Sequence, residues 1–375
     1  MTVMINNYLA IGAVNILAMT ALGYMIRHND LLDSKMRRHF LYAVLSIGIV
    51  IFAEMGTVYD AYPAEIAIAA LTGFNIIGFS LSPFVPIIIA AAFGNHFKKQ
   101  RIFFLLPSLI NLVFVFLSPV FGLIFRILPD GSYFRGPWFP VFIVSYIFSM
   151  LYLLMQSLRV IHIYQNRNQM ALFWLFLLFL LGTVIQILFP LIHTTWISVS
   201  LAMIMYYAYY CDLLEKHDVM TNLLNRRSYE YYLPVLKIKG SATIITLDVD
   251  DFKATNDRHG HPYGDESLRV IAENMKASFG KIGLCYRIGG DEFSVLSEQT
   301  SNSVMRNAEE LFLAKMDASR RQDPNLPYVS FGRALFDQTQ NGIEQVTVEA
   351  DRRMFQNKQK QKLARLRSQP ADSSQ

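Results

Sequence analysis

Residues 287–293 of the chain read Arg287-Ile288-Gly289-Gly290-Asp291-Glu292-Phe293. Two adjacent carboxylates thus follow a pair of glycines, and the run from Phe293 to Leu296 that comes next favours a β-strand. Glycine lets the backbone approach a ligand closely, and paired carboxylates commonly hold Mg²⁺ against phosphate. The stretch therefore predicts a hairpin whose turn carries a metal-binding group.

A second acidic strand end lies upstream. A β run from Ala242 to Leu247 is followed by Asp248, Val249, Asp250, Asp251, Phe252 and Lys253. Asn256 and Asp257 come shortly afterwards. Two strand ends that bear carboxylates, a lysine and a glycine turn together indicate a metal-assisted nucleotide site.

With these residues identified, the region from about Asp218 to Lys362 resembles the GGDEF domain of diguanylate cyclases, which make cyclic di-GMP from two molecules of GTP. The similar motifs occur in order along the chain: Asp218–Arg227, Asp248–Asp265, Ser330–Gly332 and Ala350–Lys358. The alternation of helices and strands favours an α/β domain with a mainly antiparallel sheet, and the resemblance implies that this domain is nucleotidyl-cyclase-like. A second interpretation is a catalytically silent GGDEF domain that acts as a GTP-binding or protein-interaction receptor. A broken metal or guanine position would favour it, and the sequence shows none.

The resemblance also implies roles for individual residues. Asp248 and Asp291 would hold Mg²⁺ or Mn²⁺ with the carbonyl of Val249, and Glu292 would lie near the reacting hydroxyl. Asn256 and Asp265 would recognise the guanine edge, and Lys253 and Lys358 would contact phosphates. The expected substrate-binding residues are therefore Phe252, Lys253, Asn256, Asp265, Lys358 and Lys362.

Several residues keep two interpretations. Lys362 either replaces a phosphate-binding arginine of relatives or simply ends a solvated basic helix. Arg287 either positions the Gly-Gly turn or lies at the surface. For three further acids a structural role as helix caps or turn residues is favoured: Asp250, Asp251 and Asp257.

Three positions are informative when the sequence is compared with the family pattern. Asn222 replaces a glycine, which is tolerable because asparagine also adopts left-handed backbone geometry. Asp265 corresponds to the aspartate that, in the family, accompanies selection of GTP alone. The inhibitory Arg-x-x-Asp run of many relatives is replaced by Gly280-Lys281-Ile282-Gly283, so feedback through that site is not expected.

The first part of the chain is a series of long apolar runs, each near the roughly 20 residues that cross a bilayer as a helix. We expect about seven spans in an all-α membrane bundle, at residues 8–26, 40–58, 66–93, 102–126, 139–158, 170–191 and 194–211. Basic residues such as Arg37 and Lys99 concentrate in the loops after the first, third and fifth spans, which places the C-terminal part in the cytoplasm. The expected location is the inner membrane of a bacterium.

The expected organisation of the 375 residues is a membrane sensor or anchor over 1–211, a helical connector over 212–217, the cyclase domain over 218–367 and a disordered tail over 368–375. Expected partners are GTP, a second copy of the chain, membrane lipid and an unidentified signal. The net charge of +5 does not indicate nucleic acid, because much of it lies in membrane-flanking loops and the last helix. Glu54, near the end of the second span, is costly in lipid and suggests a function.

Overall fold

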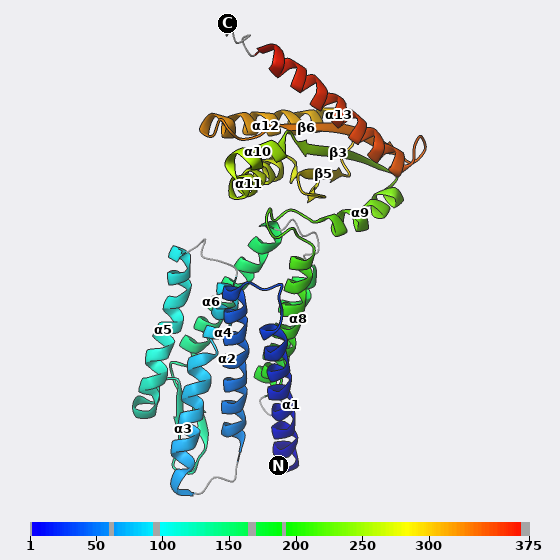
Figure 1. The fold of residues 1–375 in the computed structure, drawn as a ribbon. Coiled ribbons are helices and arrows are strands. Elements are labelled where there is room, and N and C mark those ends of the chain that lie inside the picture. The colour runs from blue at the N-terminus through cyan, green and yellow to red at the C-terminus, as the bar shows by residue number, and fades with distance from the viewer. Residues whose placement is uncertain (1, 60–63, 93–97, 164–169, 190–192, 369–375) are drawn as a thin grey trace. The chain divides into compact units, whose positions relative to one another are not determined.

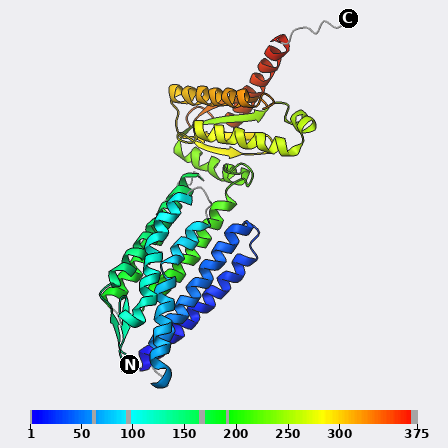
Figure 2. The same ribbon diagram turned by 90° about the vertical axis from the view of Figure 1, so that its left-hand side faces the viewer.

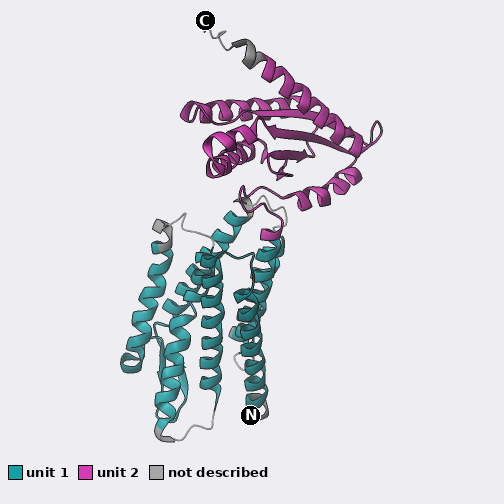
Figure 3. Cartoon of the chain, in the orientation of Figure 1, with its two compact units in different colours: residues 1–212 teal, residues 213–375 magenta. Residues whose placement is uncertain are grey.

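The computed structural model describes the chain except for residues 1, 60–63, 93–97, 164–169, 190–192 and 369–375 (Figure 1). The chain forms two compact units, Met1–Asp212 and Leu213–Gln375 (Figure 3). The first unit is helical and the second is α/β, so the expected fold class of both regions is confirmed.

The first unit contains α1 (Thr2–Arg27), α2 (Ser34–Val58), α3 (Ala64–Leu81), α4 (Phe84–Ala91), α5 (Lys98–Phe121), α6 (Phe139–Ile163), α7 (Met170–Leu188) and α8 (Thr195–Glu215). Six helical stretches among the described residues are long and apolar enough to cross a membrane: Ile5–Arg27, Ser34–Val58, Ile66–Ala91, Ile102–Phe121, Phe139–Val160 and Thr195–Glu215. The seventh expected span corresponds to α7, whose apolar stretch Met170–Gln186 is shorter.

Two span boundaries differ from the expectation. The expected span over 66–93 is divided into α3 and α4 at Pro83, because proline has no N–H to continue the helix hydrogen-bond ladder. The expected span over 102–126 is too long, because α5 ends at Phe121 and Gly122 takes a left-handed φ of 64°. The chain then forms a short hairpin of β1 (Phe125–Ile127) and β2 (Tyr133–Arg135).

The second unit contains α9 (Arg226–Lys239), β3 (Ser241–Val249), α10 (Phe252–His259), α11 (His261–Phe279), β4 (Leu284–Arg287), β5 (Glu292–Ser297), α12 (Asn302–Gln322), β6 (Val329–Asp337) and α13 (Ile343–Ser368). The strands form one antiparallel sheet in the order β4-β5-β3-β6. The helix α10 was not expected. The last helix reaches Ser368, and the rest of the expected tail lies outside the described residues.

The sheet is buried on both faces because successive strand residues point to opposite sides. Ile245, Leu247 and Val249 of β3 pack into a core that includes Leu268 of α11 and Phe312 of α12. The alternating residues of β3 belong instead to a second core, which includes residues of α9 and α13. Helices thus cover both faces, as Figure 2 also shows. At the end of the sheet where β3 finishes and β5 begins, Asp248 is partly buried and Glu292 is exposed.

Candidate active site

The pairing of β3 with β5 brings the two acidic segments together. Asp248 lies opposite Glu292 in the register, and the N–H of Val249 donates to the carbonyl of Asp291 at 3.1 Å. The side chain of Asp248 is only 15% exposed, whereas Glu292 is exposed. The carboxylates of β3 and of the Gly-Gly turn therefore meet at one end of the sheet.

Lys358 of α13 joins this acidic end through an ion pair with Asp248. Burial raises the pKa of the Asp248 carboxyl; Lys358 opposes this effect, and the charges of Asp291 and Asp250 reinforce it. Partial burial lowers the pKa of Lys358, but the hydrogen bond and charge of Asp248 outweigh burial and raise it. The lysine ammonium thus lies where several carboxylates favour a cation.

The donor set fits a hard divalent cation. No group of three or more His, Cys, Asp or Glu side chains that could hold a metal occurs among the described residues. Mg²⁺ does not need such a cage, because it usually takes one or two carboxylates, several waters and the phosphate oxygens of the substrate. Asp248, Asp291 and the Val249 carbonyl would be the candidates for such a set, and the ion pair of Lys358 with Asp248 shows that the acidic cluster attracts a positive charge.

Arg287 holds the Gly-Gly turn in place, and its side chain is only 11% exposed. Its guanidinium donates to the carbonyl of Gly290 at 2.8 Å and to Asp218 Oδ1 at 3.0 Å. Asp218 also accepts from the N–H of Thr221 at 2.9 Å. Burial raises the pKa of Asp218, but the bonds from Thr221 and Arg287 outweigh burial and lower it. Of the two interpretations of Arg287, the structure supports positioning of the turn.

Structural roles are also observed for other residues that the sequence singled out. Asp250 is buried and accepts from Ser330 Oγ at 2.7 Å, which ties the end of β3 to β6. Asp251 has a φ of 52° and lies at the N-terminus of α10, while Asp257 is exposed on that helix. Asn222 has a φ of 55°, which confirms the left-handed geometry expected there.

The expected guanine-binding residues lie on α10 and at the start of α11. Asn256 Oδ1 is buried and has no hydrogen-bond partner among the described residues. A Cβ atom on Gly264 would lie 1.9 Å from this oxygen and 3.2 Å from Phe252 Cζ. The absence of a side chain at Gly264 therefore makes space for the Asn256 amide. The next residue in the chain, Asp265, is partly buried.

Replacing Gly264 with alanine is expected to weaken GTP binding by roughly 5- to 150-fold, because the new methyl group must displace the Asn256 amide. A buried group left without its hydrogen-bond partner costs about 1–3 kcal/mol. The amide is the end of a flexible side chain, so the folded domain should persist. Calorimetric titration with a non-reactive GTP analogue measures the effect. Gly342→Ala is the matched control, since the atom nearest to its added Cβ is 3.5 Å away.

Only one of the three expected phosphate-binding lysines, Lys358, contacts the acidic cluster in the described structure. Lys253 on α10 and Lys362 on α13 are exposed. Lys362 lies four residues after Lys358, so the two side chains share one face of α13. The sequence did not predict the contacts of Asp250 with Ser330 and of Arg287 with Asp218, although all four residues had been named.

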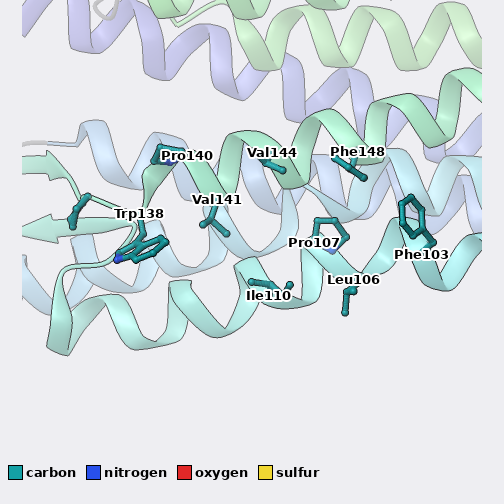
Figure 4. Close-up of a pocket in the computed structure, with 10 residues that line it drawn as sticks. Phe103, Leu106, Pro107, Ile110, Trp138, Pro140, Val141, Val144 and Phe148 are labelled. Carbon is teal, nitrogen blue, oxygen red and sulfur yellow. The ribbon is translucent and has the colours of Figure 1, made fainter.

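A pocket of about 590 Å³ in the first unit has different chemistry. It lies between α5 and α6 (Figure 4), and its walls are mostly apolar. The lining residues are Phe103, Leu106, Pro107, Ile110, Pro137, Trp138, Pro140, Val141, Val144 and Phe148. None of these lining residues carries a carboxylate or a cation, whereas the acidic cluster of Asp248 and Asp291 lies in the second unit.

Comparison with known proteins finds similarity in the second unit. The family described as "Diguanylate cyclase, GGDEF domain" matches residues 215–363. Diguanylate cyclase DosC of Escherichia coli is 34% identical over 134 residues, which are 32% of this chain and 28% of DosC. Diguanylate cyclase VdcA of Vibrio cholerae is 34% identical over 94 residues, which are 25% of this chain and 28% of VdcA. The cyclic di-GMP phosphodiesterase PdeB of Shewanella oneidensis is 31% identical over 140 residues, 35% of this chain and 16% of PdeB.

Solved GGDEF domains are also similar. The domain of DgcB from Caulobacter crescentus in complex with c-di-GMP has 25% identity and a TM-score of 0.35, with 39% of this chain and 91% of that chain covered. The active GGEEF domain of a diguanylate cyclase from Vibrio cholerae has 23% identity and a TM-score of 0.33, with 37% and 92% covered. The chain spans between 16% and 28% of the length of the three curated relatives above. Residues 215–363 thus match the GGDEF domain family and are similar to diguanylate cyclases, and they follow a helical region in which six described stretches are long and apolar enough to cross a membrane.

Proposed function

We propose that this protein is a membrane-bound diguanylate cyclase that condenses two molecules of GTP into cyclic di-GMP and two pyrophosphates. The observation that carries the proposal is the meeting of Asp248, Asp291 and Lys358 at one end of the sheet in a GGDEF domain. The names of DosC and VdcA favour synthesis. The name of PdeB shows that a similar segment also occurs in a phosphodiesterase, so activity needs a direct test.

In the proposed reaction, the 3′-oxygen of one GTP forms a bond to the α-phosphorus of the other, and the bond to pyrophosphate breaks. The same step repeated in the opposite sense closes the ring. A bound Mg²⁺ or Mn²⁺ would offset phosphate charge and acidify the attacking hydroxyl. Asp248, Asp291 and the carbonyl of Val249 would hold this cation. Glu292, exposed beside them, would face the reacting hydroxyl.

The remaining site residues would bind and orient GTP. Lys358 forms an ion pair with Asp248 in the free protein. It would bind a phosphate oxygen instead once Asp248 holds the metal ion. Lys253 and Lys362 are exposed and would add positive charge for the triphosphate. Asn256 and Asp265 would recognise guanine, because an amide and a carboxylate match its donors and acceptors. Phe252 would form part of the wall next to Asn256 and Gly264.

Each GGDEF domain would hold one GTP, so two domains must face one another before the reaction can occur. We therefore include a homodimer in the proposal. From the distribution of basic loops we propose that the second unit lies in the cytoplasm, where GTP is available, and that the first unit lies in the bacterial inner membrane. There the first unit would contact lipid and receive the signal that sets cyclase activity.

The test is incubation of the purified full-length protein with GTP and Mg²⁺, followed by identification of the nucleotide product. Cyclic di-GMP supports the proposal. Tight GTP binding by calorimetry without any product would instead support the silent receptor. A cyclic dinucleotide that contains adenine, formed when ATP is added, would contradict the selectivity expected from Asp265.

Cyclic di-GMP itself is expected to inhibit only by competing with GTP. Gly280 and Gly283 stand where many relatives carry the inhibitory Arg and Asp, and a Cβ atom on Gly283 would already lie 2.9 Å from the carbonyl oxygen of Leu296. Initial rates at several GTP concentrations measure the type of inhibition. Non-competitive inhibition, together with product binding that persists when the GTP site is filled, would contradict this expectation.

A further inference from the structure

A polar cluster lies inside the first unit, in helices that are otherwise apolar. It is centred on Glu54 of α2. Gln186 Nε2 of α7 donates to Glu54 Oε1 at 3.1 Å, and His193 Nδ1, just before α8, lies 3.3 Å from the same oxygen. Tyr8 of α1 interacts with the carboxylate, and its ring is 4.3 Å from the His193 ring. Three helices and the segment before α8 therefore contribute to one cluster.

The carboxylate of Glu54 lacks a permanent countercharge. Its side chain is 17% exposed, and Oε2 is buried without a hydrogen-bond partner among the described residues. The titratable groups that face it are Tyr8 from α1 and His193, since α7, α4 and the described side chains of α3 carry none. On α2 itself, Tyr59 follows at the C-terminal end. Of these groups, only His193 can become positive.

A buried carboxylate is costly unless it is paired or neutralised. Histidine is the side chain that ordinarily changes charge between pH 5 and 8. A transition-metal ion is a weaker candidate, because no group of three His, Cys, Asp or Glu side chains occurs among the described residues. A proton is therefore the cation that the cluster fits best.

The cluster is also tied to the start of α8. While Gln186 donates to Glu54, its Oε1 accepts from the N–H of Thr195, the first residue of α8, at 2.9 Å. Thr194 Oγ1 donates to the carbonyl of Gly182 in α7 at 2.7 Å. The helix α8 then runs without interruption to Glu215, within the segment that matches the GGDEF family. A change at Glu54 can thus reach the N-terminus of the helix that leads into the cyclase domain.

We propose that Glu54 and His193 form a proton-binding site that controls how firmly the N-terminus of α8 is held. When His193 is protonated, its charge completes an ion pair with Glu54 and keeps Gln186 on Thr195. As the pH rises and the proton leaves, the pair weakens and the α8 terminus is released. Any effect of this release on cyclic di-GMP synthesis rests on the proposed function. Proton binding and the movement of the helix terminus do not rest on it.

Trp196, the second residue of α8, allows a test that needs no catalysis. With Trp138→Phe and Trp174→Phe in the full-length chain, the tryptophan fluorescence in lipid nanodiscs comes from Trp196 alone. Without GTP, we expect its emission maximum to shift in one transition between pH 5 and 8. We expect His193→Gln and Glu54→Gln each to abolish this shift. We expect His193→Arg, which stays charged, to fix the emission at its low-pH position.

His39→Gln is the matched control, because His39 lies on the same helix as Glu54 and its Nδ1 is bonded to the carbonyl of Lys35. Its transition should match that of the unmodified background. The proposal is overturned if the background shows no transition, if His193→Gln retains it, or if His193→Arg fixes the high-pH position. Failure to detect cyclic di-GMP would count against the proposed function only. The fluorescence transitions would still decide whether the proton site exists.

Discussion

Replacing Asp291 or Asp248 with asparagine is expected to lower the rate of cyclic di-GMP synthesis by at least about 100-fold. A metal ion at a phosphoryl centre contributes several kcal/mol, and each ~1.4 kcal/mol is a tenfold change in rate. Asparagine keeps the size of the side chain but removes its charge, so packing at the ends of β3 and β5 should persist. Initial rates at saturating Mg²⁺ and GTP measure the effect.

The control for this experiment is Asp317→Asn. Asp317 is an exposed acid on α12, paired with Arg320 at 2.9 Å, outside the proposed site. Asp248→Asn also deprives Lys358 of its partner. Because that lysine is 32% exposed, thermal unfolding should change little. A site variant with near wild-type turnover would show that the metal ligands have been assigned wrongly. Thermal unfolding is measured alongside, because a variant that does not fold would say nothing about catalysis.

The sequence predicted the acidic strand ends well because their signals are local. An apolar strand that stops at Asp248 and a Gly-Gly turn that precedes Asp291 are both visible within a few residues. The same holds for Asn222, whose left-handed geometry follows from its residue type and position. The ion pair between Lys358 and Asp248 joins residues 110 positions apart, so only the resemblance to a family connected them beforehand.

The failures of prediction have physical causes too. The helix α10 has only eight residues and none of them is buried, so it gives no apolar periodicity to detect. The end of α5 was placed too late because Ile124 and Phe125 are apolar, yet they are buried in a small core next to the β1–β2 hairpin. Two partners of Glu54, Gln186 and His193, lie more than 130 positions away in the chain, and hydropathy alone does not indicate which helices adjoin it.

The end of α8 is joined to the start of the GGDEF domain by several contacts. The carbonyl of Glu215 accepts from Asn225 Nδ2 at 2.7 Å, and the carbonyl of Lys216 accepts from the N–H of Asn225 at 2.9 Å and from Ser228 Oγ at 2.8 Å. The side chain of Glu215 also pairs with Arg227. These bonds fix the last turn of α8 to the start of α9. Rotation of α8 would therefore rotate the domain with it, if the helix stays continuous.

Insertion of alanines between Asp212 and Leu213, upstream of those contacts, is expected to change basal cyclase activity periodically. Each added residue turns the domain by about 100° and advances it by about 1.5 Å. Two alanines turn it by about 200° and should change the rate by about 100-fold, since small misplacements of reacting groups carry costs of that size. Four alanines come within about 40° of a full turn and should return most of the original rate. Four glycines at the same point are the matched control, because they have the same length but weaken the helix by about 1 kcal/mol per residue. Rates that are the same for all insertions, or equal for four alanines and four glycines, would mean that the two domains of a dimer meet through a flexible tether, and rigid coupling through α8 would be wrong.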